Sequence, residues 1–310
     1  MIHPVIGDIL ASIPPHNGQP GPLDPVAVRA HEESEVPPVE ERVPVHSVTD
    51  RVVASENGDI PVRVYTPHDA SEYDVIVYFH GGAFFLGSLE THDGVARNLA
   101  NATGHRVVSV GYRRAPEAAF PAGLDDGHSV VRWITEHSDE IAWNGRTLAL
   151  AGDSSGANFA AALAARAHDE GIPVTHQVLL YPSLDLDFDA ERFPSLHENG
   201  TGYFVEYDSM LAFNAFYIAS GANPADPLVS PVKREDLTGL PPALVITAEY
   251  DPMRDEGEAY AGRLAHAGVK TVLKRYDGAT HGFMQHFAWL PEFAGSFEVV
   301  RDFLSASVKP

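Results

Sequence analysis

A serine placed between two glycines is the first feature of the chain that points to chemistry. Residues 152–156 read GDSSG, after the apolar run TLALA and before an Ala-rich stretch typical of a helix. A serine on a sharp strand-to-helix turn presents its hydroxyl as a nucleophile, and glycines flank it because a Cβ there would collide with the neighbouring strand or helix. Ser154, unlike Ser155, has glycine two positions before and after it. We predict that Ser154 is the nucleophile.

A base and a carboxylate follow in the order that such a nucleophile needs. Asp251 ends the run ALVITAEYD, and His281 stands beyond the last apolar run of the chain, in GATHGF. Both positions are expected at the carboxyl ends of successive strands, where open α/β sheets build their sites. We predict that His281 is the base and that Asp251 orients it, with Asp255 as a rival for the second role.

A glycine-rich loop predicts the groups that would stabilise a developing oxyanion. HGGA at residues 80–83 follows the strand-like run VIVYF, the connection in which a serine hydrolase of this chain order takes its other oxyanion donors. We expect the backbone N–H groups of Gly81, Gly82 and Ser155 to bind the oxyanion, the last of them at a helix N-terminus. Covalent catalysis of this kind needs no metal.

Phenylalanines near these motifs predict an apolar substrate pocket. Core packing is the alternative for each of them taken singly. The predicted substrate-binding residues are Phe84 and Phe85 on the glycine-rich loop, Phe204 and Phe213 in a later insertion, and Phe283 beside His281.

Apolar runs along the chain predict the sheet that positions these groups. Extended runs at 46–55 and 60–66 flank the turn sequence ENGD and indicate an antiparallel hairpin. Six further apolar runs, beginning near residues 75, 106, 147, 178, 243 and 271, alternate with helical patterns. Runs without polar alternation are typical of strands buried on both faces. The sequence therefore predicts an α/β fold with eight strands, the last six mostly parallel.

Two segments fall outside this alternation. The first 45 residues carry many prolines and glutamates and predict an arm of short helices laid over the domain. About 60 residues separate the strands near Pro182 and Pro242, which indicates an insertion. We predict an arm at 1–45 and an insertion at 184–235 that together form a cap, with a catalytic domain at 46–183 and 236–310.

Composition limits the partners. The formal net charge is −22, and the chain has no cysteine. Such a charge disfavours nucleic acid and stable association with anionic membranes, and the missing cysteines exclude disulfides and a thiol nucleophile. Without a long apolar run or a signal-like start, we expect a cytoplasmic, soluble protein. The acidic composition fits a salt-adapted source as well as an ordinary acidic protein.

Five motifs in this order carry a family resemblance: HGGAF, GYRRAPEAAFPAGLDD, GDSSGAN, YDPMRDEG and THGF. With them the chain resembles the hormone-sensitive-lipase family of bacterial carboxylesterases over roughly residues 45–310. The resemblance implies an α/β-hydrolase fold, a helical cap, hydrolysis of short to medium acyl esters without a cofactor, and Asp251 rather than Asp255. Two departures are Ala83, where the family has a third glycine, and Ser155, where it usually has alanine.

Other functions stay open at this point. An amidase, a lactonase or an acyltransferase would use the same triad up to the acyl-enzyme. A small-molecule receptor could share the scaffold, but the retained His281 argues against it. A lipase acting at lipid surfaces would need an exposed apolar lid face, and the negative charge argues against docking on anionic lipid. A homodimer is also left open.

Overall fold

One eight-stranded sheet organises the protein. The computed structural model describes residues 1–13, 24–56 and 58–307. The strands run in the spatial order β1-β2-β4-β3-β5-β6-β7-β8. Their bounds are β1 (Ser47–Ser55), β2 (Gly58–Thr66), β3 (Tyr73–Phe79), β4 (Arg106–Val110), β5 (Trp143–Asp153), β6 (His176–Leu180), β7 (Ala243–Tyr250) and β8 (Thr271–Thr280).

The pairing confirms the predicted strand count and directions. β1 and β2 pair antiparallel, β2 pairs antiparallel with β4, and every other pair is parallel. The hairpin strands therefore lie where the sequence predicts them, although Asn57 of the predicted turn is outside the described residues.

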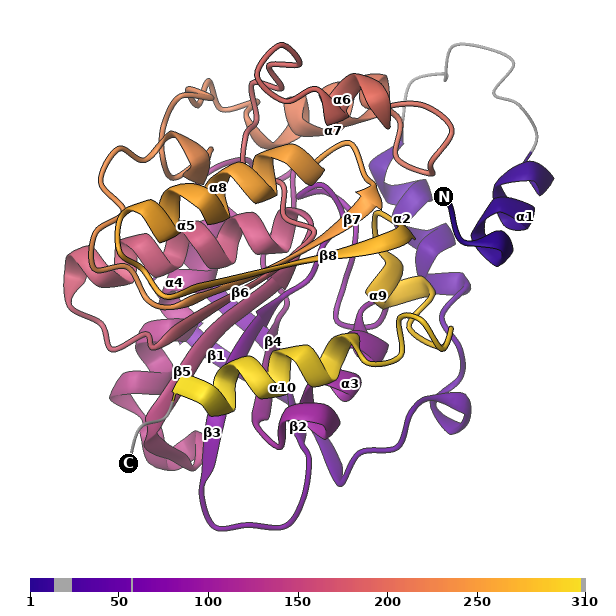
Figure 1. Ribbon diagram of the computed structural model, residues 1–310. Helices are drawn as coiled ribbons and strands as arrows, with labels where there is room; N and C mark the ends of the chain where they lie inside the picture. Colours follow the sequence, from indigo (N-terminus) through magenta and orange to yellow (C-terminus); the bar gives the residue numbers. More distant parts are fainter. Residues whose placement is uncertain (14–23, 57, 308–310) are drawn as a thin grey trace.

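Helices cover both faces of the sheet (Figure 1). One face carries α4 (Ala122–Glu136), α5 (Ser155–Glu170) and α8 (Arg254–His266), and the other carries α3 (Asp93–Thr103) and α10 (Ser296–Ser307). In β3, Val77 and Phe79 join the first core cluster, while Ile76 and Tyr78 join the second. Because both faces of the central strands β3 to β7 are buried, these strands need apolar residues at successive positions, which is why they read as continuous runs. The edge strand β8 differs from the prediction, since its apolar run is exposed at Val272 and Leu273.

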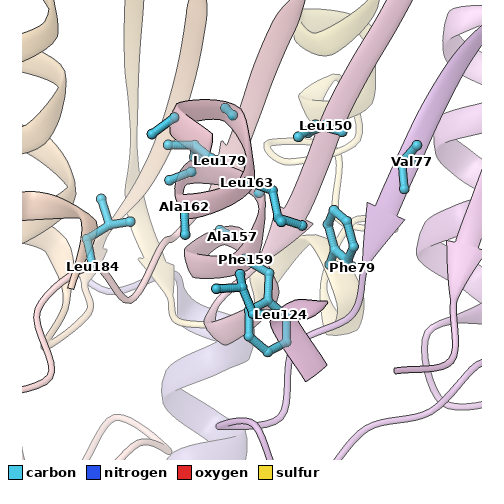
Figure 2. Packing of buried hydrophobic residues seen from close by; sticks show 14 of the residues in the cluster. Val77, Phe79, Leu124, Leu150, Ala157, Phe159, Ala162, Leu163, Leu179 and Leu184 are labelled. Carbon is cyan, nitrogen blue, oxygen red and sulfur yellow. The ribbon is translucent and has the colours of Figure 1, made fainter. Parts of the chain in front are cut away.

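Helix α5 contributes most of its buried residues to the first core cluster. Figure 2 shows Phe79 of β3 close to Phe159 and Leu163 of the helix, and the two phenylalanine rings meet edge to face with centroids 6.3 Å apart. Burial of such side chains stabilises the fold by about 1.5–3 kcal/mol each. The packing fixes α5 against the sheet, and with it the turn that joins β5 to the helix.

Short helices occupy the arm and the insertion. The arm contains α1 (Pro4–Ser12), α2 (Pro25–Ser34) and η1 (Val39–Glu41), and the insertion contains α6 (Ser195–Glu198), α7 (Tyr207–Tyr217) and η3 (Pro231–Lys233). The two remaining elements are η2 (Ser138–Ile141) and α9 (Phe283–His286). Within α7, Met210 and Tyr217 are buried but Leu211 is exposed, so the apolar residues of the insertion do not all face the core.

Candidate active site

Ser154 lies at the junction of β5 and α5 in a strained backbone conformation. Its φ and ψ are 54° and −121°, and the helix begins at the next residue. A Cβ on Gly152 would lie 2.2 Å from the carbonyl oxygen of Gly156, and one on Gly156 would lie 2.1 Å from that of Phe79. The two glycines are therefore required by the close approach of helix and strand, as the sequence indicates.

A chain of hydrogen bonds links three of the predicted residues. Nε2 of His281 is 2.9 Å from the Ser154 hydroxyl, and Nδ1 is 2.8 Å from a carboxylate oxygen of Asp251. An ionised carboxylate only accepts hydrogen bonds, so Nδ1 donates to Asp251 and Nε2 is left to accept from the serine. The ring of Tyr181 packs edge to face against the imidazole, with centroids 5.0 Å apart.

Asp251 is held on both sides. Its side chain is buried, and its second carboxylate oxygen accepts the backbone N–H of Met253 at 2.8 Å. The rival Asp255 is directed elsewhere, because its carboxylate accepts the backbone N–H of Ser195 at 2.9 Å and Nε of Arg254 at 2.8 Å. The structure thus brings Asp251, and not Asp255, to the imidazole.

The glycine-rich loop after β3 corrects part of the predicted oxyanion site. The N–H of Gly81 donates to the carboxylate of Asp153 at 2.9 Å, so this predicted donor is already engaged. In the described part of the chain, the N–H groups of Gly82, Ala83 and Ser155 have no acceptor. Gly82 and Ser155 therefore remain candidate donors, and Ala83 takes the place predicted for Gly81.

Ala83 occupies a conformation that favours glycine. Its φ is 50°, and that of Phe84 is 66°, whereas Gly82 has a φ of 113°. A Cβ on Gly82 would lie 2.4 Å from the backbone of Leu86. The loop tolerates alanine in place of the third glycine at a cost of about 1–2 kcal/mol, but the second position requires glycine.

Polar groups buried behind this loop were not predicted from the sequence. The Asp153 carboxylate accepts the hydroxyl of Tyr78 at 2.5 Å and lies 3.5 Å from Nε2 of His92. Burial alone would raise the pKa of Asp153, but His92, the Tyr78 hydroxyl and His80 together lower it below its ordinary value. The only sequence signal for this role of Asp153 is its position between Gly152 and Ser154 in the G-x-S-x-G motif.

His80 has a structural environment. Its ring stacks on Tyr112 with centroids 4.2 Å apart, and Nδ1 lies 2.8 Å from the carbonyl oxygen of Gly81. Burial, and then the neighbouring His92, lower the pKa of His80 to about 3. The imidazole is therefore neutral at neutral pH. Its one N–H lies on Nδ1, because the Gly81 carbonyl oxygen can only accept.

The five predicted substrate-binding phenylalanines do not form one pocket. Phe84 is buried and stacks on Tyr217 at 3.9 Å, and Phe85 is buried against Phe213 and Phe216 of α7. Phe283 is fully buried on the other side of the sheet, where it packs with Tyr276 and Phe293. Only Phe204 is markedly exposed, at 38%. Packing in the core therefore accounts for Phe84, Phe85 and Phe283.

Within residues 1–13, 24–56 and 58–307, no group of three or more His, Cys, Asp or Glu side chains could hold a metal ion. No helix in these ranges is long and apolar enough to cross a membrane.

Known proteins resemble the chain over most of its length. The family model described as alpha/beta hydrolase fold matches residues 76–285. An arylesterase of Saccharolobus solfataricus is 37% identical over 242 residues, 78% of each chain. The carboxylesterase NlhH of Mycobacterium tuberculosis is 39% identical over 261 residues, 82% of this chain and 81% of the relative. The structure of a hyperthermophilic esterase from Pyrobaculum calidifontis superposes with a TM-score of 0.90 at 36% identity, covering 99% of both chains.

Proposed function

Because the chain belongs to the hormone-sensitive-lipase family of α/β-hydrolase fold carboxylesterases, and is a carboxylic ester hydrolase, we propose that Ser154, His281 and Asp251 form its catalytic triad. The observation that carries the proposal is the hydrogen-bond chain from the Ser154 hydroxyl through both imidazole nitrogens to the buried Asp251 carboxylate. Residues from the ends of three different strands meet there in the roles that an acyl transfer needs.

The reaction begins with proton transfer. Nε2 of His281 takes the Ser154 proton as the oxygen attacks the ester carbonyl, and Asp251 stabilises the imidazolium that forms. The carbonyl oxygen becomes an oxyanion, which the N–H groups of Gly82, Ala83 and Ser155 bind. His281 then gives its proton to the departing alcohol, and an acyl-enzyme remains on Ser154.

Water completes the cycle. His281 removes a proton from a water molecule as the water attacks the acyl-enzyme, and the same three N–H groups bind the second oxyanion. The serine leaves with the proton held by His281, and the carboxylic acid is released. Every step uses side chains and backbone of this chain, so no cofactor is proposed.

The proposed substrates are small esters of short to medium acyl chains. The rings of Phe84 and Phe85 beside the proposed oxyanion site are packed against cap and core residues, which leaves them no freedom to line a long apolar channel. We further propose that the arm at 1–45 and the insertion at 184–235 act together as the cap over this site.

The test is hydrolysis of p-nitrophenyl acetate, butyrate, octanoate and palmitate by the wild type and by Ser154→Ala, at low and at molar salt. We expect fast hydrolysis of acetate and butyrate, weak hydrolysis of palmitate, and loss of nearly all activity in the variant. Ser129→Ala is the control and keeps wild-type rates, because Ser129 lies on α4 and its hydroxyl donates to the carbonyl oxygen of Asp125. Activity that survives in Ser154→Ala would refute the triad, and preference for palmitate would refute the acyl range.

A further inference from the structure

Helix α2 is attached to the protein by polar contacts. None of its residues is buried. Its half-buried positions are Pro25, Val28, Arg29 and Glu32, which share one helix face through their i, i+3, i+4, i+7 spacing. A face that contains two charged residues and no buried apolar side chain contributes little hydrophobic stabilisation. The contacts made by those two charges therefore explain where α2 lies.

Arg29 reaches the loop that carries the proposed oxyanion donors. Its Nε donates to the carbonyl oxygen of Phe85 at 2.6 Å, and one terminal nitrogen donates to the carbonyl oxygen of Ala115 at 2.5 Å. The N–H of Ala115 in turn donates to the carbonyl oxygen of Phe84 at 3.0 Å. The planar guanidinium thus bridges Phe85 of the loop and Ala115 of the segment after β4, and Ala115 itself contacts the loop at Phe84.

Glu32, one turn further along α2, makes the second contact. Its carboxylate accepts the backbone N–H of Gly87 at 3.3 Å. Gly87 closes the loop tightly, because a Cβ there would lie 2.2 Å from the carbonyl oxygen of Gly81. Two charged side chains from one helix face therefore contact the loop at Phe85 and at Gly87.

Holding the Phe85 carbonyl in place also restrains the proposed oxyanion donors, Gly82 and Ala83, because the loop is a tight turn. The N–H groups of Phe85 and Leu86 donate to the carbonyl oxygen of Gly82 at 3.0 and 2.7 Å. Ala83 and Phe84, between them, have positive φ angles. Residues in such a conformation keep it only where the surrounding structure imposes it. An anchor at Phe85 therefore restrains the direction of the Gly82 and Ala83 N–H groups.

We propose that Arg29 is a positioning residue that holds the oxyanion loop of the catalytic domain in its working conformation from the N-terminal arm. The proposal rests on the proposed function, which assigns Gly82 and Ala83 as oxyanion donors. Hydrogen bonds from a charged donor to carbonyl oxygens are stronger than neutral ones, and the forked guanidinium can hold two carbonyls at once. A lysine ammonium in its place carries the charge without the fork.

The experiment compares Arg29→Lys and Arg29→Ala with Glu117→Gln. Glu117 binds the same guanidinium through both oxygens at 2.9 Å but does not touch the loop, so it is a matched control. Loss of one oxyanion donor costs about 10²–10³ in kcat, and a displaced donor costs less, so we expect both Arg29 variants to lose about 10- to 100-fold in kcat on p-nitrophenyl butyrate. KM should change less than about threefold, because only the transition state uses the oxyanion donors.

A second readout separates positioning from mere stability. A trifluoromethyl ketone forms a tetrahedral adduct with the serine, so its affinity should fall by the same factor as kcat in both Arg29 variants and stay near wild type in Glu117→Gln. Wild-type kcat and inhibitor affinity in a folded Arg29→Lys would overturn the proposal, as would equal losses in Glu117→Gln. Where Arg29→Ala does not fold, Arg29→Lys decides.

Measuring Ser154→Ala in parallel distinguishes failure of the proposed function from failure of the positioning role. If it keeps activity, the proposed function fails whatever Arg29 does. If it is inactive while Arg29→Lys matches the wild type, only the positioning role fails.

Discussion

The carboxylate of Asp153 accepts the backbone N–H of Gly81, across 2.9 Å, and so ties the residue before the proposed nucleophile to the loop that carries the proposed oxyanion donors. Both ends of this bond are buried, and the same carboxylate oxygen also accepts the Tyr78 hydroxyl. The turn at Ser154 and the loop at residues 80–87 are therefore held together by a buried hydrogen bond, so a shift of one should move the other.

Asp153→Ala should remove the hydrogen bond between the Ser154 turn and the loop. It leaves the Gly81 N–H and the Tyr78 hydroxyl without their buried acceptor, at a cost of about 1–3 kcal/mol for each group. We expect a lower free energy of unfolding in urea and a kcat reduced at least tenfold on p-nitrophenyl butyrate. Asp153→Asn keeps an acceptor oxygen and should lose less of both. Equal kcat in the wild type and both variants would show that the bond does not position the loop.

Asp251→Asn should abolish most activity with the fold intact. The amide can present its NH₂ to Nδ1 and so stabilise the wrong imidazole tautomer, a change that lowers kcat on the order of 10⁴-fold in serine hydrolases. Asp255→Asn is the paired control, because its carboxylate binds Ser195 and Arg254 instead. We expect its kcat to stay within about threefold of wild type. The opposite ranking of the two variants would transfer the role to Asp255.

His80 should make the fold weaker in mild acid. Burial lowers the pKa of His80 from an ordinary 6.5 to about 3, so between these values the unfolded chain binds a proton that the folded one does not. This contribution to stability is complete above pH 6.5 and is lost as pH falls towards 3, at roughly 1.4 kcal/mol per pH unit. Urea unfolding of the wild type and of His80→Gln from pH 5 to 8 measures it. The free energy of unfolding should fall less steeply with decreasing pH in the variant, by about 1.4 kcal/mol per pH unit. Equal pH dependence in the two proteins would contradict the assignment.

Tyr217→Phe should not destabilise the protein. The Tyr217 hydroxyl is buried and finds no hydrogen-bond partner within the ranges that the structure describes, while its ring stacks on Phe84 at 3.9 Å. Removing an unsatisfied hydroxyl while keeping the ring should raise the free energy of unfolding by about 1 kcal/mol. Tyr217→Ala also removes the ring and should lower it by about 3–5 kcal/mol. Thermal and urea unfolding of both variants test the pair, and a Tyr217→Phe loss above about 1 kcal/mol would mean that the hydroxyl is bonded.

The sheet could be predicted from sequence because its central strands, β3 to β7, are buried on both faces. Runs such as VIVYF and ALVITAE have no polar alternation, and both faces of β3 and β7 lie in core clusters. The positions of Ser154, Asp251 and His281 follow from the same pattern, since each stands at or shortly after the end of a predicted apolar run. The structure places them directly after β5, β7 and β8. In a parallel arrangement those ends meet at one edge.

The oxyanion loop and the pocket could not be predicted in the same way. Sequence shows that Gly81 has no side chain, but not that Asp153 already accepts its N–H. It shows that Phe283 follows His281 closely, but not that the ring turns into the core beside Tyr276. The contact of Arg29 with Phe85 joins residues 56 positions apart and leaves no periodic signal. Such tertiary contacts are decided by packing, which local patterns do not encode.

Ser154 and His281 are 127 residues apart in the chain, and His281 follows β8, which forms one edge of the sheet. Local helices such as α5 can form before so distant a strand pairs with β7, because long-range pairing must first overcome the entropy of closing a large loop. We therefore expect ellipticity to recover ahead of turnover when the unfolded chain refolds. The delay between the two signals would measure how long β8 takes to pair with β7 after the local helices have formed.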